Sequence, residues 1–173
     1  MKYFTLLLLP VLMPFGNSQR LQPSVDDQVV TTYYLIRHAE KDRSDASNSN
    51  PDLNESGVQR AMKWSEVFKD IPLNMIFSTD YNRTRQTAGP TAKSKDLEVI
   101  IYDASKLFTE KIKADTKGKN VLIVGHSNTT PQFVNMILEE SKYENIDDSE
   151  NGALFIVQVL ADGSKTSKVL YIN

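Results

Sequence analysis

Residues 31–40 read TTYYLIRHAE, and this stretch decides the fold. The run from Tyr33 to Ile36 is apolar and rich in aromatic and branched residues, which is typical of a buried strand. It ends abruptly at Arg37 and His38. Two cation-capable side chains are costly at the end of a core strand if they only pack there, and ligands bind at the carboxyl ends of strands in open α/β sheets. The stretch therefore predicts a core strand that carries Arg37 and His38 into a binding site.

The second histidine follows the same pattern. The chain has only two histidines, and His126 comes directly after the apolar run 120–125. Either histidine taken alone is readily explained as a satisfied residue at the end of a strand. Because both follow apolar strands, we interpret His38 and His126 as parts of one site.

The composition sets limits on the function. A length of 173 residues fits one domain, and 40% hydrophobic with 24% charged residues is ordinary for a globular protein. The net charge of −2 gives no reason to expect nucleic acid or an anionic membrane as a partner. The chain has no cysteine, which excludes disulfides, thiolate metal sites and cysteine nucleophiles.

The first residues have the pattern of a signal peptide. Lys2 supplies a positive charge, residues 4–15 are almost wholly apolar, and small residues precede a cleavage site after Ser18. The apolar stretch is shorter than the ~20 residues that span a bilayer, and an uncleaved anchor is the alternative. We therefore expect a signal peptide over 1–18, a linker over 19–29 and a domain over 30–173. The protein is then secreted or periplasmic, with no membrane span after cleavage.

The rest of the chain alternates between strands and helices and closes with a hairpin. After residue 40, the pattern predicts strands over 73–77, 97–102, 121–124, 153–160 and 165–172. It predicts a helix that opens at residues 53–57 with Asn54 as its N-cap and ends at Pro72, and further helices over 81–88 and 104–114 and from Thr129. This order predicts an α/β three-layer sandwich whose mainly parallel sheet has an antiparallel edge. Residues 141–151 are acidic and are interpreted as a solvated loop.

Two arginines open the second predicted helix. The positive end of a helix dipole disfavours cations such as Arg83 and Arg85, by about 0.3–1 kcal/mol each. A bound anion at that end reverses the sign of this effect. Arg85 is interpreted as a solvated side chain, whereas the position in the helix by itself leaves Arg83 open between a solvated side chain and a ligand for an anion.

These residues resemble the motifs of the histidine phosphatase superfamily, which has the phosphoglycerate mutase-like fold. The similar segments are RHAE at 37–40, S-x4-RT-x2-TA at 78–88 and GH at 125–126, in the order found in that family. Residues 53–57, LNESG, also resemble the start of its first helix. One departure is Ala39, which replaces a glycine often found after the first histidine. The resemblance implies an α/β fold and phosphoryl-transfer chemistry.

The resemblance also implies roles for four residues. His38 is the expected nucleophile and forms a phosphohistidine, while Arg37, Arg83 and His126 bind the phosphate. The chemistry of these side chains agrees, because a neutral imidazole is nucleophilic near pH 7 and planar guanidinium groups match phosphate. His126 is expected to stabilise charge in the transition state.

The general acid that protonates the leaving oxygen is less clearly marked. Asp103 follows the third predicted strand and is the candidate, although an N-cap role explains it equally well. Glu110 and Asp42 are the fallback candidates. Many family members place Glu after this strand, so Asp103 departs from the pattern.

The sequence favours an exported phosphatase that hydrolyses phosphomonoesters of small molecules. Two alternatives stay open, namely a mutase that transfers phosphate between positions and a domain that binds phosphoryl ligands without turnover. No cofactor is expected, and two histidines without cysteines make a poor zinc site, which normally takes at least three protein ligands. The oligomeric state is left open.

Overall fold

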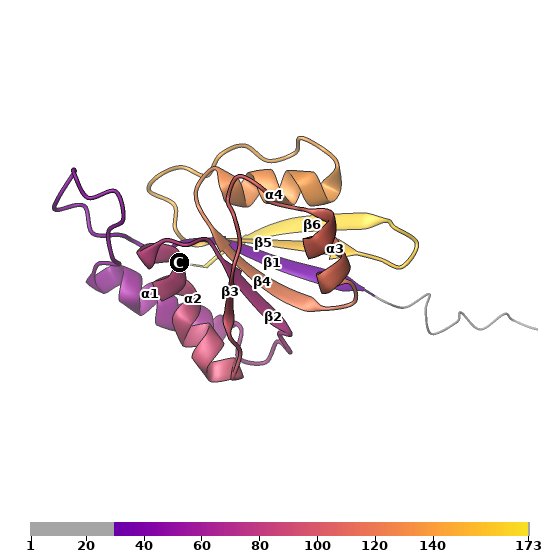
Figure 1. Cartoon of the computed structure of the whole chain (residues 1–173), viewed down its shortest axis with the longest axis horizontal. Helices are drawn as coiled ribbons and strands as arrows, with labels where there is room; N and C mark the ends of the chain where they lie inside the picture. Colours follow the sequence, from indigo (N-terminus) through magenta and orange to yellow (C-terminus); the bar gives the residue numbers. More distant parts are fainter. Residues whose placement is uncertain (1–29, 173) are drawn as a thin grey trace, which may run out of the picture.

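The protein is described by a computed structural model that covers residues 30–172 (Figure 1). The predicted signal peptide over 1–18 and the predicted linker over 19–29 lie outside these residues. The strands are β1 (Thr31–Arg37), β2 (Met75–Ser78), β3 (Val99–Ile101), β4 (Asn120–Gly125), β5 (Ala153–Val159) and β6 (Lys165–Tyr171). The helices are α1 (Glu55–Val67), α2 (Asn82–Lys95), α3 (Glu110–Thr116) and α4 (Thr129–Leu138). Within the described part of the chain, no helix combines the length and the apolar character that crossing a membrane requires.

One mixed sheet organises residues 30–172. Its six strands lie in the order β3-β2-β4-β1-β5-β6. The first four of these are parallel to one another, while β5 runs antiparallel to β1 and pairs with β6 in a hairpin. β1 is therefore a central strand with neighbours on both edges, which explains why its apolar run is almost entirely buried.

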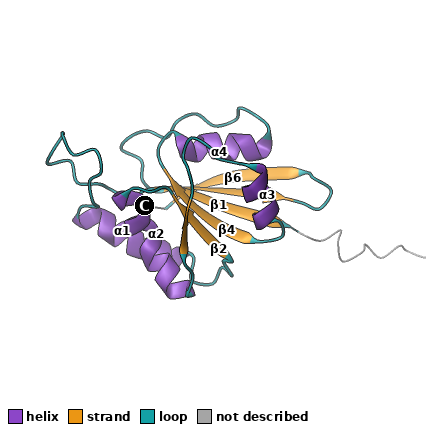
Figure 2. Ribbon diagram, viewed as in Figure 1, coloured by secondary structure: helices purple, strands orange, loops and turns teal. Residues whose placement is uncertain are grey.

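Helices cover both faces of the sheet, as Figure 2 shows. α1 and α2 lie on one face, where Trp64 and Phe68 pack with Ile36 of β1. α3 and α4 lie on the other face, where Phe133 packs with Tyr33 of β1. Successive residues of β1 thus face opposite cores, and the predicted three-layer α/β sandwich with an antiparallel edge is confirmed.

The predicted helix over 104–114 is wrong in its position. Residues 103–106 form a turn, in which the Lys106 N–H donates to the Asp103 carbonyl over 2.9 Å, and the helix begins only at Glu110. The Thr109 hydroxyl caps this helix by accepting from the Ile112 N–H over 3.2 Å. Thr109 is as good an N-cap as Asp103, because its hydroxyl satisfies one of the free N–H groups at the start of the helix.

A close backbone approach fixes the segment that follows β1. Asn54 caps α1 as predicted, since its side chain accepts from the Gly57 N–H over 2.9 Å. A Cβ at Gly57 would lie 2.0 Å from the Glu40 carbonyl oxygen, so only glycine fits there. The start of α1 therefore holds the residues after the first histidine close to the sheet.

Candidate active site

The parallel pairing of β1 and β4 brings the two histidines together. Arg37 is opposite Gly125 in the register, and the His38 N–H donates to the Gly125 carbonyl over 2.9 Å. The centroids of the His38 and His126 rings are 5.5 Å apart, with the planes at 69°. The two strand ends that the sequence singled out therefore form one site.

The environment of His38 suits a nucleophile. The side chain is buried, with 4% of its surface exposed. Its Nδ1 lies 2.7 Å from the Ala39 carbonyl oxygen. Because a carbonyl only accepts hydrogen bonds, Nδ1 carries the proton and Nε2 keeps its lone pair. Burial lowers the pKa of His38 to about 3, and the charges of Arg37 and Arg83 act in the same direction.

This low pKa predicts a loss of stability in acid. In the unfolded chain His38 takes up its proton near pH 6.5, whereas in the folded protein it does so only near pH 3. Between these two pH values the unfolded state binds more protons than the folded state. The free energy of unfolding therefore decreases as the pH is lowered, by up to about 1.4 kcal/mol per pH unit for one such group. We expect His38→Gln to lose less stability than the wild type between pH 7 and pH 5, as measured by urea unfolding in phosphate-free buffer. Equal losses in the two proteins would contradict this.

Arg83 carries an unpaired guanidinium into the same site. It lies in the first turn of α2, and its guanidinium carbon is 4.4 Å from the centre of the Tyr81 ring. Its Nε and Nη1 atoms are buried and have no hydrogen-bond partner among the described residues. Burial lowers the pKa of Arg83, and Arg37 adds to this effect. Buried donors without a partner are rare, so an anion that accepts from Arg83 would satisfy them.

The neighbouring arginine behaves differently. Arg85 is exposed, and its Nη1 lies 3.0 Å from an Oδ1 of Asp80. This placement agrees with the prediction of a solvated side chain. Arg85 and Arg83 therefore form a natural pair of test and control positions on one helix.

Arg37 is buried, with 2% of its surface exposed, and residues 147–150 hold it in place. Its Nη1 donates to the carbonyls of Asp147 over 2.8 Å and Glu150 over 3.2 Å, and its Nη2 lies 2.5 Å from the Asp148 carboxylate. The Arg37 Nε is buried and has no partner among residues 30–172. One edge of this guanidinium is therefore fixed by the protein, and Nε is left to bind a ligand.

The acidic segment 141–151 is thus more than a solvated loop, and that interpretation was wrong for its second half. The Asn151 side chain also reaches the site, since its Nδ2 donates to the His38 carbonyl over 2.9 Å. These contacts join residues more than 100 positions apart. An arginine at the end of a buried strand needs hydrogen-bond acceptors. This need is the only indication in the sequence that another segment contacts Arg37.

His126 is positioned by a threonine that the sequence reasoning missed. The His126 Nε2 lies 2.9 Å from the Thr79 hydroxyl, which itself donates to Thr84 over 3.0 Å. Because the hydroxyl hydrogen of Thr79 is used in this way, Nε2 carries a proton and donates to Thr79. Burial lowers the pKa of His126 to about 4, with Arg83 as the next cause. His126 is therefore a neutral donor at pH 7. The sequence signal that could have identified Thr79 is its position directly after a predicted strand.

We expect Thr79→Val to reduce the catalytic efficiency while the fold is kept. Valine has nearly the same shape as threonine but cannot accept from Nε2, so the His126 ring loses its orientation. The loss of one hydrogen bond of about 0.5–1.5 kcal/mol corresponds to a decrease of about 3–10-fold in kcat/KM. Steady-state kinetics measures the decrease, and Thr79→Ser is the matched control that keeps the hydroxyl. Equal losses in both variants would argue against this role.

The candidates for the general acid lie apart from these contacts. Asp103 is exposed, and its carboxylate accepts from the Ser105 N–H and hydroxyl over 2.8 and 2.7 Å, which lowers its pKa. Asp42 is exposed and accepts from the Ser44 N–H over 2.9 Å. Glu110 is exposed in the first turn of α3. The structure does not bring any of the three into contact with His38 or His126 through a hydrogen bond.

A pocket of about 280 Å³ opens beside His38. Lys41, Arg43 and Asn151 line it together with Asp148, whose carboxylate lies 2.6 Å from the Arg43 Nη2. The lining thus combines the cations Lys41 and Arg43 with the carboxylates of Glu40 and Asp148, and the pocket leaves room for a small molecule next to His38.

Comparisons with known proteins agree with this geometry. Residues 33–106 match the model of the histidine phosphatase superfamily (branch 1). A probable phosphoglycerate mutase, GpmB of Escherichia coli O1:K1 / APEC, is 28% identical over 141 residues, which cover 76% of this chain and 65% of that protein. The chain thus spans slightly less than two thirds of the length of this relative.

Solved structures show the same fold. A phosphoglycerate mutase from Bacillus anthracis str. Sterne superposes with a TM-score of 0.65 at 17% identity, covering 84% of this chain and 94% of that one. The protein histidine phosphatase SixA complexed with tungstate superposes with a TM-score of 0.63 at 14% identity, covering 81% and 96%. Residues 33–106 are thus similar in sequence to the histidine phosphatase superfamily, and the fold is similar to that of the phosphoglycerate mutase and SixA structures.

Proposed function

We propose that the protein is an exported phosphatase that hydrolyses small phosphomonoesters through a phosphohistidine on His38, without a metal ion. One observation carries this proposal, namely the free Nε2 lone pair of His38 in the same site as the unpaired guanidinium of Arg83. A nucleophile next to unsatisfied cationic donors is the arrangement that phosphoryl transfer requires.

The proposed reaction has two steps. In the first, Nε2 of His38 attacks phosphorus, the bond from phosphorus to the ester oxygen breaks, and that oxygen leaves with the electron pair and takes up a proton. In the second, water attacks phosphorus and gives up a proton to solvent, the phosphorus–nitrogen bond breaks with its electron pair returning to Nε2, and inorganic phosphate is released. The Nε of Arg37 and the guanidinium of Arg83 bind the equatorial oxygens, where charge accumulates. His126 adds a donor to them when its Nε2–H turns from the Thr79 hydroxyl to the phosphate.

The length of the segment between Arg83 and His126 favours hydrolysis over transfer between substrate positions. The segment between Arg83 and His126 is short and contains the rest of α2, then β3, α3 and β4 with their connections. It offers little room for an inserted lid that would retain a phosphorylated intermediate. The substrate site is accordingly expected to be open to water.

The test is the hydrolysis of an aryl phosphate by the mature chain, residues 19–173, in excess EDTA. We expect inorganic phosphate to be released, and a phosphorylated protein to be trapped by an alkaline quench. Transfer of phosphate to a second substrate position without release would support the mutase alternative. Binding of inorganic phosphate without any turnover of esters would support the non-catalytic alternative.

The same assay tests the general acid. Because the Asp103 carboxylate is exposed and its pKa is lowered, we expect Asp103→Asn to change the rates for aryl and alkyl phosphates by less than about twofold. A true general acid affects poor leaving groups far more than aryl phosphates, which leave readily without a proton. Selective slowing of alkyl phosphates would therefore restore Asp103 as the acid.

Export rests on residues 1–18 alone. Expression with this segment should yield a protein outside the cytoplasm whose first residue is Gln19. N-terminal sequencing of the recovered protein checks this, and an intact Met1 on a membrane-bound protein would favour an uncleaved anchor.

A further inference from the structure

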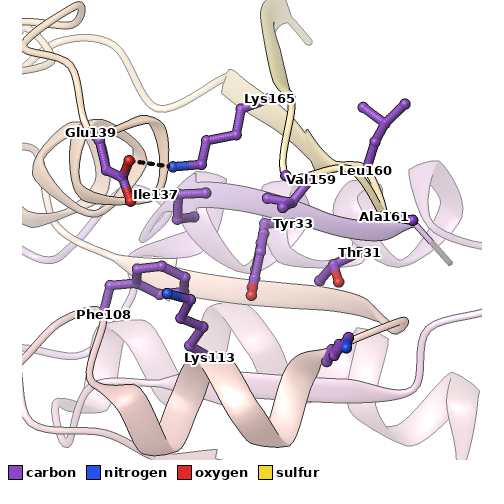
Figure 3. Close-up of a pocket in the computed structure, with 12 residues that line it drawn as sticks. Thr31, Tyr33, Phe108, Lys113, Ile137, Glu139, Val159, Leu160, Ala161 and Lys165 are labelled. Carbon is purple, nitrogen blue, oxygen red and sulfur yellow. Dashed lines mark ion pairs between the residues drawn. The ribbon is translucent and has the colours of Figure 1, made fainter. Parts of the chain in front are cut away.

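A second pocket lies beside the start of β1, whereas the active site lies beyond the end of that strand; Figure 3 shows the residues that line this pocket. It measures about 370 Å³, and Thr31 at the start of β1 lines it. Arg37 ends the same strand, and six steps of about 3.3 Å separate the two residues by ~20 Å. A molecule in this pocket therefore cannot touch His38, so the pocket is a separate site.

The walls of this pocket are apolar and pre-formed. Figure 3 shows Tyr33, Phe108, Ile137 and Val159 gathered around it, and they come from different segments of the chain. The rings of Tyr33 and Phe108 meet edge to face, with centroids 5.8 Å apart and planes at 89°. The Tyr33 hydroxyl is tied to the Thr116 hydroxyl over 2.6 Å, and burial raises its pKa, so the ring stays neutral.

The rim of the pocket is cationic. Three lysines line it against one carboxylate, that of Glu139, which pairs with Lys165 over 2.9 Å (Figure 3) and also attracts Lys113 at longer range. Lys113 lies 4.0 Å from Glu110, a carboxylate that is 92% exposed and so screens it weakly. Lys117 forms no ion pair with another residue of the described range 30–172. Because three lysines face one carboxylate in the lining, the rim keeps a net positive charge for a ligand.

We propose that this pocket binds a small organic anion, namely a carboxylate attached to an aromatic body of one or two rings. The volume lies at the lower end of the range for ligand sites, about 300–1,000 Å³, which fits such a body and excludes a large ligand. Aromatic walls favour edge-to-face contacts with rings, and the lysines at the rim favour a carboxylate. Because a carboxylate is not a phosphate ester, the ligand differs in class from the proposed substrate.

The experiment is a calorimetric titration of the protein with 1-naphthoate, in saturating inorganic phosphate so that the active site is occupied. We expect one molecule to bind per chain, in the high-micromolar to millimolar range. The double variant Lys113→Glu/Lys117→Glu should weaken binding by at least about tenfold, because it replaces two attractions with two repulsions. The control is Lys168→Glu, an exposed position of β6 outside the pocket, which should leave the affinity unchanged.

A second ligand keeps the proposal falsifiable if the double variant is poorly folded. 1-Naphthylmethylamine has the same rings with the opposite charge, and we expect it to bind the wild type at least about tenfold more weakly. Equal binding of the amine, or unchanged binding in the double variant, would overturn the proposal. Sedimentation showing that the ligand-free protein self-associates through Lys113 and Lys117 would also overturn it, because a second copy would then occupy the pocket.

Discussion

His38→Ala is expected to abolish the hydrolysis of aryl phosphates while the protein stays folded. If Nε2 forms the bond to phosphorus, no other described side chain replaces it, and the loss of a nucleophile costs on the order of 10⁴–10⁶ in kcat. The residue follows β1, and its side chain hydrogen-bonds only within the adjacent segment. The core layers therefore do not depend on it.

The measurement pairs single-turnover kinetics with thermal unfolding. The phosphorylated protein that an alkaline quench traps in the wild type should be absent in His38→Ala. His38→Gln is a useful companion, because it keeps a polar side chain but lacks a nucleophilic nitrogen lone pair. Turnover near the wild-type level in either variant would remove His38 from the nucleophile role.

Arg83→Met is expected to have the second-largest effect on activity and a different effect on stability. The removal of one donor that stabilises charge in the transition state costs about 10²–10³ in kcat. The Nε and Nη1 of Arg83 are buried without a partner among the described residues, and a buried unpaired charge destabilises the fold. The apolar methionine side chain should therefore leave the melting temperature in phosphate-free buffer equal to or above that of the wild type.

The stabilisation of the protein by phosphate separates the effect of Arg83 on ligand binding from its effect on folding. Phosphate at 100 times its Kd should stabilise the wild type by about 2.7 kcal/mol, and this gain should largely disappear in Arg83→Met. Arg85→Met is the matched control on the same helix, because Arg85 is exposed and paired with Asp80. It should keep both the activity and the response to phosphate. A similar loss in the two variants would mean that Arg83 acts only through the general charge of the helix.

Much of the fold follows from local patterns in the sequence. The apolar run of β1, the Asn54 cap and the alternation of elements depend on neighbouring residues, so they are readable without the structure. The helix over 104–114 was the main error, because Asp103 and Thr109 are both good caps and only packing selects between them. The second helix was predicted only over 81–88, whereas α2 continues past Pro90 to Lys95. Contacts between α1 and α2, such as that of the Ser65 hydroxyl with the Pro90 carbonyl over 3.3 Å, are not visible in a linear pattern.

The sequence by itself determined the α/β class, the two strand ends that carry His38 and His126, and Arg83 at the start of a helix. These features are local, because each depends on residue types within one turn or one strand. Three features came only from the tertiary structure: residues 147–151 hold Arg37 and His38, Thr79 orients His126, and Nε and Nη1 of Arg83 have no hydrogen-bond partner within residues 30–172. Hydrogen bonds between residues up to 113 positions apart leave no local signature, since the folded backbone alone brings donor and acceptor together.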